Sequence, residues 1–527
     1  MLFSRRHLIK AGGAIPLLGV MNPIAGRADV PVHRWDGYDF GPAPAVPDRL
    51  NQGPFGVEQD EGWQTIGFTN PSRQHVRNFG TGLVAYTHEE SGPSVAVREG
   101  KESLERAVEK LATLPFADVL YIRCDWRDVQ RRPGKLDLSP VWKLTFDAAK
   151  QYGLRVGFRV QLSSPNFQPR QLAMPDFLQQ KIPLVKIGRM RGKDQAGAHD
   201  WEFIEPRYDH PEFRKAFREL NELLAAEFDD DPLVEFMDMM MYGFWGEGHT
   251  NKLPNPFPDY VTAEKTMVEM TRFQIETWKK VPLAINTQPD ISHVGNRECL
   301  DLAVRAGCWL RSDSTVYIEE PLQVERLSHR PPWLAVVMEE GSNRHYELSK
   351  LTFDAAGIND RENAMLHVLD LNANYWSLWT EADNLRRYYD KYPYGIDTLQ
   401  QRMGYRVRPS WIWQRKRYGS SEVILGLAND GVAGVPGVLR IHLESLDGKV
   451  RVGGGLDAGH PHGGRTREAS FLLPKGMEGQ QMRIRAELET RGVRRPVRWA
   501  CAQPLDAAGA LTIQLKRFDD GGWRKGV

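Results

Sequence analysis

Between about residue 80 and residue 385, eight short apolar runs alternate with longer amphipathic stretches, and no other feature of the chain constrains the fold as strongly. Short apolar runs are typical of strands that are buried on both faces, and amphipathic stretches are typical of the helices that connect parallel strands. Two such helices are expected at 103–111 and 213–228. The eight expected strands are 82–86, 118–124, 155–160, 234–242, 282–286, 308–311, 333–338 and 375–379.

Eight parallel strands within roughly 300 residues suit a closed (β/α)8 barrel, whose usual length is about 250 residues with room for insertions. The alternative is an open, doubly wound sheet. Such a sheet usually carries a glycine-rich phosphate-binding turn after an early strand, and neither a G-x-G-x-x-G nor a P-loop pattern occurs there. We therefore expect an α/β protein built on a TIM barrel.

The pattern changes after about residue 400, where apolar residues alternate with polar ones in period two. Turn sequences such as those at 429–431 and 447–448 separate these runs, which indicates an antiparallel β-sandwich. The expected organisation is a signal segment at 1–28, an N-terminal extension or linker at 29–70, a catalytic barrel at 71–400 and the sandwich at 401–527.

The N-terminus resembles an export signal. Arg5 and Arg6 precede a short apolar stretch, residues 11–20, that is too short to span a bilayer. The small residues at 25–28 offer a cleavage region, so we expect a twin-arginine signal and a periplasmic or secreted protein without a membrane anchor. A Sec-type signal that happens to contain two arginines is the alternative. The export machinery is then the expected protein partner.

Charge and cysteine usage narrow the classes of partner. The chain has 69 basic and 68 acidic residues, which gives no excess of positive charge for a nucleic acid or an anionic membrane. Its four cysteines form no C-x-x-C pair and have no histidines at metal-ligand spacing. We therefore expect each cysteine to be a small buried side chain, and a disulfide scaffold is not indicated.

Polar and aromatic residues collect where the expected strands end, and in a TIM barrel these ends form the active-site face. The fourth strand runs into residues 243–249 (GFWGEGH), in which glycines bracket Glu247. Glycine lets a backbone approach a ligand closely, and aromatic faces suit the apolar faces of sugar rings. A carboxylate held against aromatic surface also stays protonated more readily, as a general acid must.

A second carboxylate, Glu339, follows the seventh strand, which stands nearly opposite the fourth in a barrel of eight. Cleavage of a glycosidic bond needs such a pair, one acid to protonate the leaving oxygen and one carboxylate to attack the sugar or to activate water. Two carboxylates suffice for this chemistry, so we expect no cofactor and no metal. The expected partner is a carbohydrate substrate.

The order of these features resembles the clan A glycoside hydrolases, including the β-galactosidase-like families. The resemblance rests on a glutamate after strand four, a glutamate after strand seven, Trp379 at the end of strand eight and the segment 121–137. Residues 243–249 also resemble the G-x-W-G-E-x-H motif of an uncharacterised bacterial barrel family whose barrel is followed by a β-sandwich. The resemblance covers about residues 65–520 and implies a retaining mechanism, with Glu247 as acid/base and Glu339 as nucleophile.

Clan A enzymes usually place asparagine directly before the acid/base glutamate, where it contacts the sugar 2-hydroxyl, but Gly246 stands there in this chain. Asn286 or Gln288 could replace that contact, or the substrate differs at that hydroxyl. The neighbouring Glu340 is the fallback for the nucleophile, because side chains alternate along a strand and only one of the two can face the pocket. Glu339 is preferred since it gives the E-x-G spacing of several clan members.

Further residues are expected to bind substrate or to hold the glutamates. Trp126, Trp245 and Trp379 are candidate stacking faces, with packing at the barrel mouth as the alternative. Arg159 and Arg123 are candidates to hold down the pKa of the strand-seven carboxylate, with an ion pair inside the barrel as the alternative. His249 is expected to orient Glu247 or to touch sugar. The substrate-binding set is Trp126, Arg159, Trp245, His249, Asn286 and Trp379.

The sequence therefore predicts an exported glycoside hydrolase that acts on an oligo- or polysaccharide. Two alternatives remain open. The first is a non-catalytic glycan-binding protein on the same scaffold, favoured by Gly246. The second is a metal-dependent hydrolase using His88, Asp125 and His249. It is the weaker alternative because the sequence contains no H-E-x-x-H pattern.

Overall fold

A computed structural model describes residues 32–35, 38–42, 62–88, 93–163, 172–194, 197–250, 253–287, 296–312, 321–339, 360–378, 380–391 and 393–518. The chain divides into two compact units, residues 1–58 and 59–527. The described part of the first unit is an antiparallel pair of strands, β1 (Val32–Trp35) and β2 (Tyr38–Pro42). The candidate site lies in the second unit.

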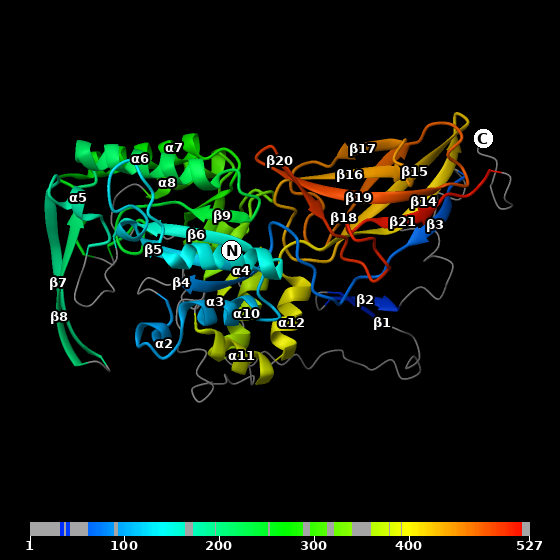
Figure 1. Ribbon diagram of the computed structural model, residues 1–527. Coiled ribbons are helices and arrows are strands. Elements are labelled where there is room, and N and C mark those ends of the chain that lie inside the picture. Colours follow the sequence, from blue (N-terminus) through cyan, green and yellow to red (C-terminus); the bar gives the residue numbers. More distant parts are fainter. Residues whose placement is uncertain are drawn as a thin grey trace, which may run out of the picture. The chain divides into compact units, whose positions relative to one another are not determined.

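The second unit contains a closed barrel of eight parallel strands, as the alternation of apolar runs predicts (Figure 1). Each of the eight expected runs forms one strand, and neighbouring strands along the chain pair with one another around the barrel. The barrel strands are β4 (Gly82–His88), β5 (Val119–Asp125), β6 (Arg155–Gln161), β9 (Val234–Asp238), β10 (Leu283–Asn286), β11 (Trp309–Ser312), β12 (Val336–Glu339) and β13 (Tyr375–Leu378).

Helices follow the barrel strands along the chain. In α6 the apolar residues Phe213, Phe217, Leu220 and Leu224 are buried at helical spacing, and Pro211 occupies the first turn, where a missing N–H costs nothing. The described helices are α2 (Val95–Arg98), α3 (Leu104–Ala112), α4 (Pro140–Tyr152), α5 (Asp176–Gln179), α6 (Pro211–Phe228), α7 (Tyr260–Thr277), α8 (Asn296–Arg305), α9 (Pro321–Ser328), α10 (Asp360–Asp370), α11 (Ala382–Lys391) and α12 (Pro393–Arg402), with a short 3-10 helix, η2 (Trp126–Asp128).

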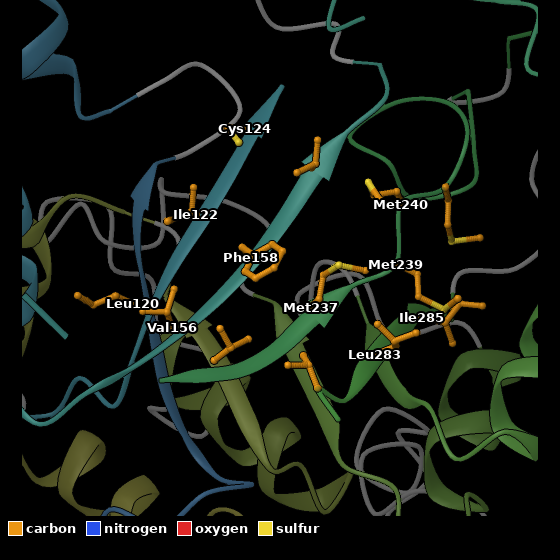
Figure 2. Packing of buried hydrophobic residues seen from close by; sticks show 14 of the residues in the cluster. Leu120, Ile122, Cys124, Val156, Phe158, Met237, Met239, Met240, Leu283 and Ile285 are labelled. Carbon is orange, nitrogen blue, oxygen red and sulfur yellow. The ribbon is translucent and has the colours of Figure 1, made fainter. Parts of the chain in front are cut away.

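Side chains along each barrel strand alternate between two environments. Leu120, Ile122 and Cys124 of β5 belong to the apolar layer shared with the helices, together with Val156 and Phe158 of β6 (Figure 2). The intervening residues, such as Tyr121, pack with the interior of the barrel. Because successive side chains on a strand point to opposite faces, Arg123 and Asp125 face the barrel interior with Tyr121.

Two features were not expected from the sequence. The strand predicted at 234–242 ends at Asp238, and the following four residues are buried without belonging to the strand. A long antiparallel hairpin, β7 (Leu184–Asp194) and β8 (Gly197–Pro206), is inserted between β6 and β9 (Figure 1). Side-chain alternation is weak in this segment, and so the hairpin gave little signal.

The predicted C-terminal β-sandwich is present as two antiparallel sheets. One sheet has the order β18-β15-β14-β3, and the other has the order β17-β16-β19-β20 with β21 paired to β19. Strand β3 lies within the segment expected to be a linker, and it pairs with β14. The strands are β3 (Gln64–Phe68), β14 (Val407–Arg417), β15 (Ser420–Asn429), β16 (Val438–Ser445), β17 (Arg451–Gly455), β18 (Thr466–Leu472), β19 (Gln481–Thr490), β20 (Val493–Val497) and β21 (Leu511–Gln514).

The apolar interior of the barrel is continuous with the core of the sandwich. Phe79, which precedes β4, lies 5.8 Å from the ring of Trp309 on β11, and its carbonyl accepts a hydrogen bond from Tyr405 near the start of the sandwich. This contact involves the residues at the N-terminal ends of the strands. The C-terminal ends, where barrel enzymes place their chemistry, are therefore left to the candidate site.

Candidate active site

Among the described residues, a cluster of six charged side chains lies in the barrel interior toward the C-terminal ends of the strands. Each is at most 2% exposed, and the set contains three cations and three anions. Charges removed from water need opposite charges close by, and the equal numbers meet that need inside the barrel. The six residues are Arg123 of β5, Arg159 of β6, Arg311 of β11, Asp238 of β9, Glu339 of β12 and Glu247 of the loop after β9.

The two predicted glutamates converge on one guanidinium. Nη1 of Arg123 lies 3.4 Å from Oε1 of Glu247 and 3.3 Å from Oε1 of Glu339. The two oxygens are therefore at most about 6.7 Å apart, the two distances laid end to end. Carboxyl groups stand about 5–5.5 Å apart in retaining glycosidases and about 6.5–9.5 Å apart in inverting ones. The two carboxyl groups are therefore close enough to flank one glycosidic bond.

Glu339, the last residue of β12, is held by groups from three other strands. Arg311 forms an ion pair with its Oε2, and the hydroxyl of Tyr86 donates to its Oε1 at 2.8 Å. Burial acts to raise the pKa of Glu339, but the charges of Arg123 and Arg311 outweigh burial, so its pKa is lowered. The carboxylate is thus kept ionised, as a nucleophile requires.

Glu247 is also held as an anion, which differs from what its aromatic surroundings led us to expect. Nη1 of Arg159 donates to its Oε1 at 2.7 Å, and Nε2 of His249 lies 3.3 Å from its Oε2. Burial acts to raise the pKa of Glu247. The hydrogen bond with His249 and the charges of Arg159 and Arg123 outweigh burial and lower it. Direct cationic contacts are stronger here than the effect of aromatic surface.

The loop that carries Glu247 depends on its glycines for its own shape. Gly243, Gly246 and Gly248 have φ of 77°, 72° and 79°, a region that L-residues rarely adopt. A Cβ on Gly243 would overlap the carbonyl oxygen of His249, because the backbone closes on itself there. Trp245 has a φ of 56°, which is unusual for a bulky residue and marks a strained position. The glycines thus serve the turn that presents Glu247.

Residues that sequence reasoning did not single out anchor this loop. The amide of Gly243 donates to the hydroxyl of Tyr208 at 3.0 Å, and that hydroxyl donates to Glu205 at 2.6 Å. The ring of Phe244 packs 5.0 Å from Phe203 of the inserted hairpin. The hairpin and the residues just after it therefore hold the loop from outside the barrel.

The predicted substrate-binding residues fall into different positions. Trp126 is fully buried, donates to Gln130 at 2.8 Å and packs edge-on against Phe213 of α6, so the expectation that it offers a stacking face to sugar is wrong in this structure. It follows Cys124 on the helix-facing side of its strand, whereas a face open to ligand would require the opposite side. Trp245 is half-buried beside His249, with ring centroids 5.6 Å apart.

Three further predicted residues take the following places. Asn286 is the last residue of β10 and is 6% exposed. Arg159 contacts Glu247 and Asp238, whereas the direct cationic contacts of Glu339 come from Arg123 and Arg311. The positions of Trp379, Glu340 and Gln288 lie outside the described residues.

Asp238, Arg311 and Tyr86 are the site residues that the sequence analysis did not assign a role. Oδ2 of Asp238 lies 2.9 Å from Arg311 and 3.2 Å from Arg159, and Tyr121 donates a hydrogen bond to it. A signal for all three was present in the sequence. Each is a polar residue two positions after an interior apolar residue and at the C-terminal end of a barrel strand.

The residues of the metal-dependent alternative do not form a metal centre. Nδ1 of His88 lies 2.7 Å from the carbonyl oxygen of Arg123, and His249 contacts Glu247. Within the described parts of the chain, no group of three or more His, Cys, Asp or Glu side chains is placed to hold a metal ion.

The fold and the charged interior define a (β/α)8 barrel with paired carboxylates at its C-terminal end. No protein-family model matches the sequence, and no curated protein matches it significantly. Among solved structures, the chain is similar to the catalytic domain of a β-amylase from Paenibacillus polymyxa, with 12% identity, a TM-score of 0.38 and coverage of 58% of this chain and 94% of that chain.

Two other solved structures are similar at the same level. A thermostable xylanase mutant from Cellvibrio japonicus has 11% identity and a TM-score of 0.35, with coverage of 57% of this chain and 86% of that chain. A cold-adapted β-galactosidase from Rahnella sp. R3 has 12% identity and a TM-score of 0.37, with coverage of 63% of this chain and 59% of that chain.

Proposed function

We propose that this protein is a glycoside hydrolase that cleaves an O-glycosidic bond of an oligo- or polysaccharide with retention of configuration. One observation carries the proposal: Glu247 and Glu339 approach the same guanidinium nitrogen of Arg123 from opposite sides of the barrel. Two carboxylates this close can flank one bond, which is the requirement of the double-displacement mechanism.

In the proposed first step, the carboxylate of Glu339 attacks the anomeric carbon while Glu247 gives a proton to the departing oxygen. The glycosidic C–O bond breaks and a glycosyl ester with Glu339 forms. In the second step Glu247 takes a proton from water, and the oxygen of that water attacks the anomeric carbon. The ester bond then breaks and releases Glu339. Arg311 and Tyr86 hold Glu339 in place for both steps.

The substrate contacts belong to the same proposal. Trp245 is half-buried next to His249 and offers a stacking face for a sugar ring. Asn286 at the end of β10 and Trp379 after β13 are the further proposed contacts. A carbohydrate is the proposed partner.

A non-catalytic glycan-binding protein is the second candidate, and one observation favours it. The pKa of Glu247 is lowered, which disfavours the protonated form that the first step needs. Arg159 and Arg123 both contribute to this effect. A protein that only binds sugar would tolerate a permanently ionised Glu247.

Hydrolysis of 4-nitrophenyl glycosides by the wild type, Glu247→Ala and Glu339→Ala tests the first candidate. Glu105→Ala, which changes an exposed glutamate of α3, is the matched control. We expect both site variants to lose at least about 10²-fold in kcat/KM and the control to retain it. Added azide should give glycosyl azides of opposite anomeric configuration with the two site variants, because it replaces the nucleophile in one and the activated water in the other.

Other outcomes of the same panel point elsewhere. Sugar binding by the wild type without turnover would favour the glycan-binding protein. Turnover that a chelator abolishes would favour the metal-dependent hydrolase. Equal activity of Glu339→Ala and the control would contradict the two-glutamate mechanism.

We further propose that the protein is exported through the twin-arginine pathway to the periplasm or beyond. The support is the pair Arg5-Arg6 followed by the apolar stretch 11–20. In the described portion of the chain, no helix has the length and apolar character needed to cross a membrane. Replacing both arginines by lysine should retain the protein in the cytoplasm, whereas unchanged export would indicate a Sec-type signal.

A further inference from the structure

Two polar residues end neighbouring strands beside the charged cluster. Asp125 is the last residue of β5, Gln161 is the last residue of β6, and the two are register partners in the parallel pairing. Each lies two positions beyond an arginine of the cluster, and the alternation of side chains along a strand assigns both to the interior face of the barrel. They therefore form the next layer of side chains toward the mouth of the barrel.

Both residues are buried, and within the described structure polar atoms of each lack a hydrogen-bond partner. Asp125 is 2% exposed and Gln161 is 0% exposed. Within the described structure, Oδ1 of Asp125 and both polar atoms of the Gln161 amide have no hydrogen-bond partner. Asp125 occupies the N-cap position of η2, but its side chain makes no capping hydrogen bond. A buried polar group without a partner is costly, and such a group in a folded protein calls for a reason.

The pair lies against the loop that carries Glu247. A Cβ added to Gly246 would lie 3.5 Å from Cδ of Arg159 and 3.8 Å from Cα of Gln161, so the backbone next to Glu247 passes directly beside Gln161. A ligand held by Gln161 would therefore be adjacent to Glu247.

We propose that Asp125 and Gln161 together bind two hydroxyl groups of a neutral sugar ring that is positioned between Glu247 and Glu339. The amide of Gln161 offers both a donor and an acceptor, which matches the two roles of a hydroxyl group. Arg159 and Arg311 below the pair are engaged with carboxylates, so these two cations do not favour an anionic ligand there. This inference rests on the proposed carbohydrate function and assigns the residues that recognise the ring.

The state of Asp125 supports this assignment. Burial raises the pKa of Asp125, the charge of Asp128 raises it further, and the charge of Arg127 offsets these effects only in part. The neutral carboxyl group is thereby favoured, and it can donate one hydrogen bond and accept another. A neutral acid next to a neutral amide suits uncharged hydroxyl groups.

Calorimetric titration with glucose, galactose, mannose and xylose tests the proposal without requiring turnover. The variants are Gln161→Met and Asp125→Leu, and Glu105→Gln is the control because it changes an exposed glutamate of α3. For the sugar that the wild type binds best, we expect both site variants to lose at least about tenfold in affinity. Each substitution removes a polar group of the protein, so a hydroxyl group of the bound sugar is left without its hydrogen-bond partner. The control should change the affinity less than about twofold.

Thermal unfolding provides a readout that is independent of the ligand. Gln274 is a buried glutamine whose amide bonds both the N–H and the carbonyl of Met240, at 2.8 and 3.0 Å, so Gln274→Met should lower Tm. Gln161→Met removes an amide without partners, so its Tm should be maintained or raised.

Three results would overturn the inference. The first is that the site variants bind sugar as tightly as the wild type. The second is that the wild type binds none of the four sugars. The third is that Gln161→Met lowers Tm as much as Gln274→Met does. Failure of the proposed hydrolase is seen separately, as absence of aryl glycoside turnover. Sugar binding that depends on Asp125 and Gln161 but lacks turnover would support the inference and contradict the hydrolase.

Discussion

The prediction that probes the charged interior most directly is the substitution Arg123→Met. Arg123 is 2% exposed and is the only one of the three clustered arginines with direct ion pairs to both Glu247 and Glu339 among the described residues. Its removal leaves two cations against three buried anions. Breaking a buried ion pair by removing one partner costs about 3–5 kcal/mol, a large part of the total stability of about 5–15 kcal/mol of an ordinary domain.

The cost of Arg123→Met should depend on pH with a definite sign. In the wild type the pKa values of Glu247 and Glu339 are lowered, so these groups contribute stability above about pH 4.3, the unfolded value, and lose it below. Without Arg123 both pKa values rise, and the folded variant can take up protons near pH 5. The deficit relative to the wild type should therefore be smaller at pH 5 than at pH 7.

Urea unfolding at both pH values, followed by tryptophan fluorescence, measures this deficit. The control is Arg440→Met, which breaks the partly exposed pair of Arg440 with Glu489 in the sandwich and should cost less than about 1 kcal/mol. A deficit for Arg123→Met no larger than that of the control, or one that is equal at pH 5 and pH 7, would refute the account of Arg123 as the shared counter-ion.

Three further predictions concern the loop and the carboxylates. Gly246→Ala should lower the free energy of unfolding by about 1–3 kcal/mol, because alanine is strained at the positive φ of this position. Gly243→Ala should lower it more, because the added Cβ also overlaps backbone atoms. Urea unfolding measures both costs, and equal costs would contradict the tight closure of the loop. Tyr208→Phe removes the hydroxyl that accepts from the buried Gly243 amide and donates to Glu205, and it should cost about 1–3 kcal/mol by the same assay. Tyr418→Phe, at a position 77% exposed, should change little. The double variant Glu247→Gln/Glu339→Gln should lose less stability than the wild type between pH 5 and pH 3, and a parallel loss would show that these carboxylates are not the groups that titrate.

The charged cluster has a consequence for how the barrel is built. A barrel interior is normally a packed apolar core, but here three arginines and three acids occupy the layer beneath the mouth. Apolar residues of similar size would often give equal or greater stability than a buried ion network. Function at this end of the barrel therefore accounts better for the cluster than stability does.

Much of the architecture was readable from the sequence because local patterns determine it. Apolar runs of strand length, amphipathic stretches between them and the later change to period two predicted the eight barrel strands and the sandwich. The same reasoning placed Glu247 after the fourth strand and Glu339 at the seventh. The hairpin of β7 and β8 and the strand β3 were missed, since their pairing partners and packing supply stability that their own patterns do not show.

What the sequence determined by itself was the set of polar side chains delivered to one end of the barrel, because strand alternation and the position of strand ends are local properties. Which of them meet was decided only by the tertiary structure. Closure of the barrel brought Arg123 between two glutamates 92 positions apart in the chain and turned Trp126 toward α6. It also paired Asp125 with Gln161 in register and, among the described residues, left Oδ1 of Asp125 and the amide of Gln161 without hydrogen-bond partners. Contacts between distant segments depend on register and packing across the whole barrel, and no local pattern encodes them.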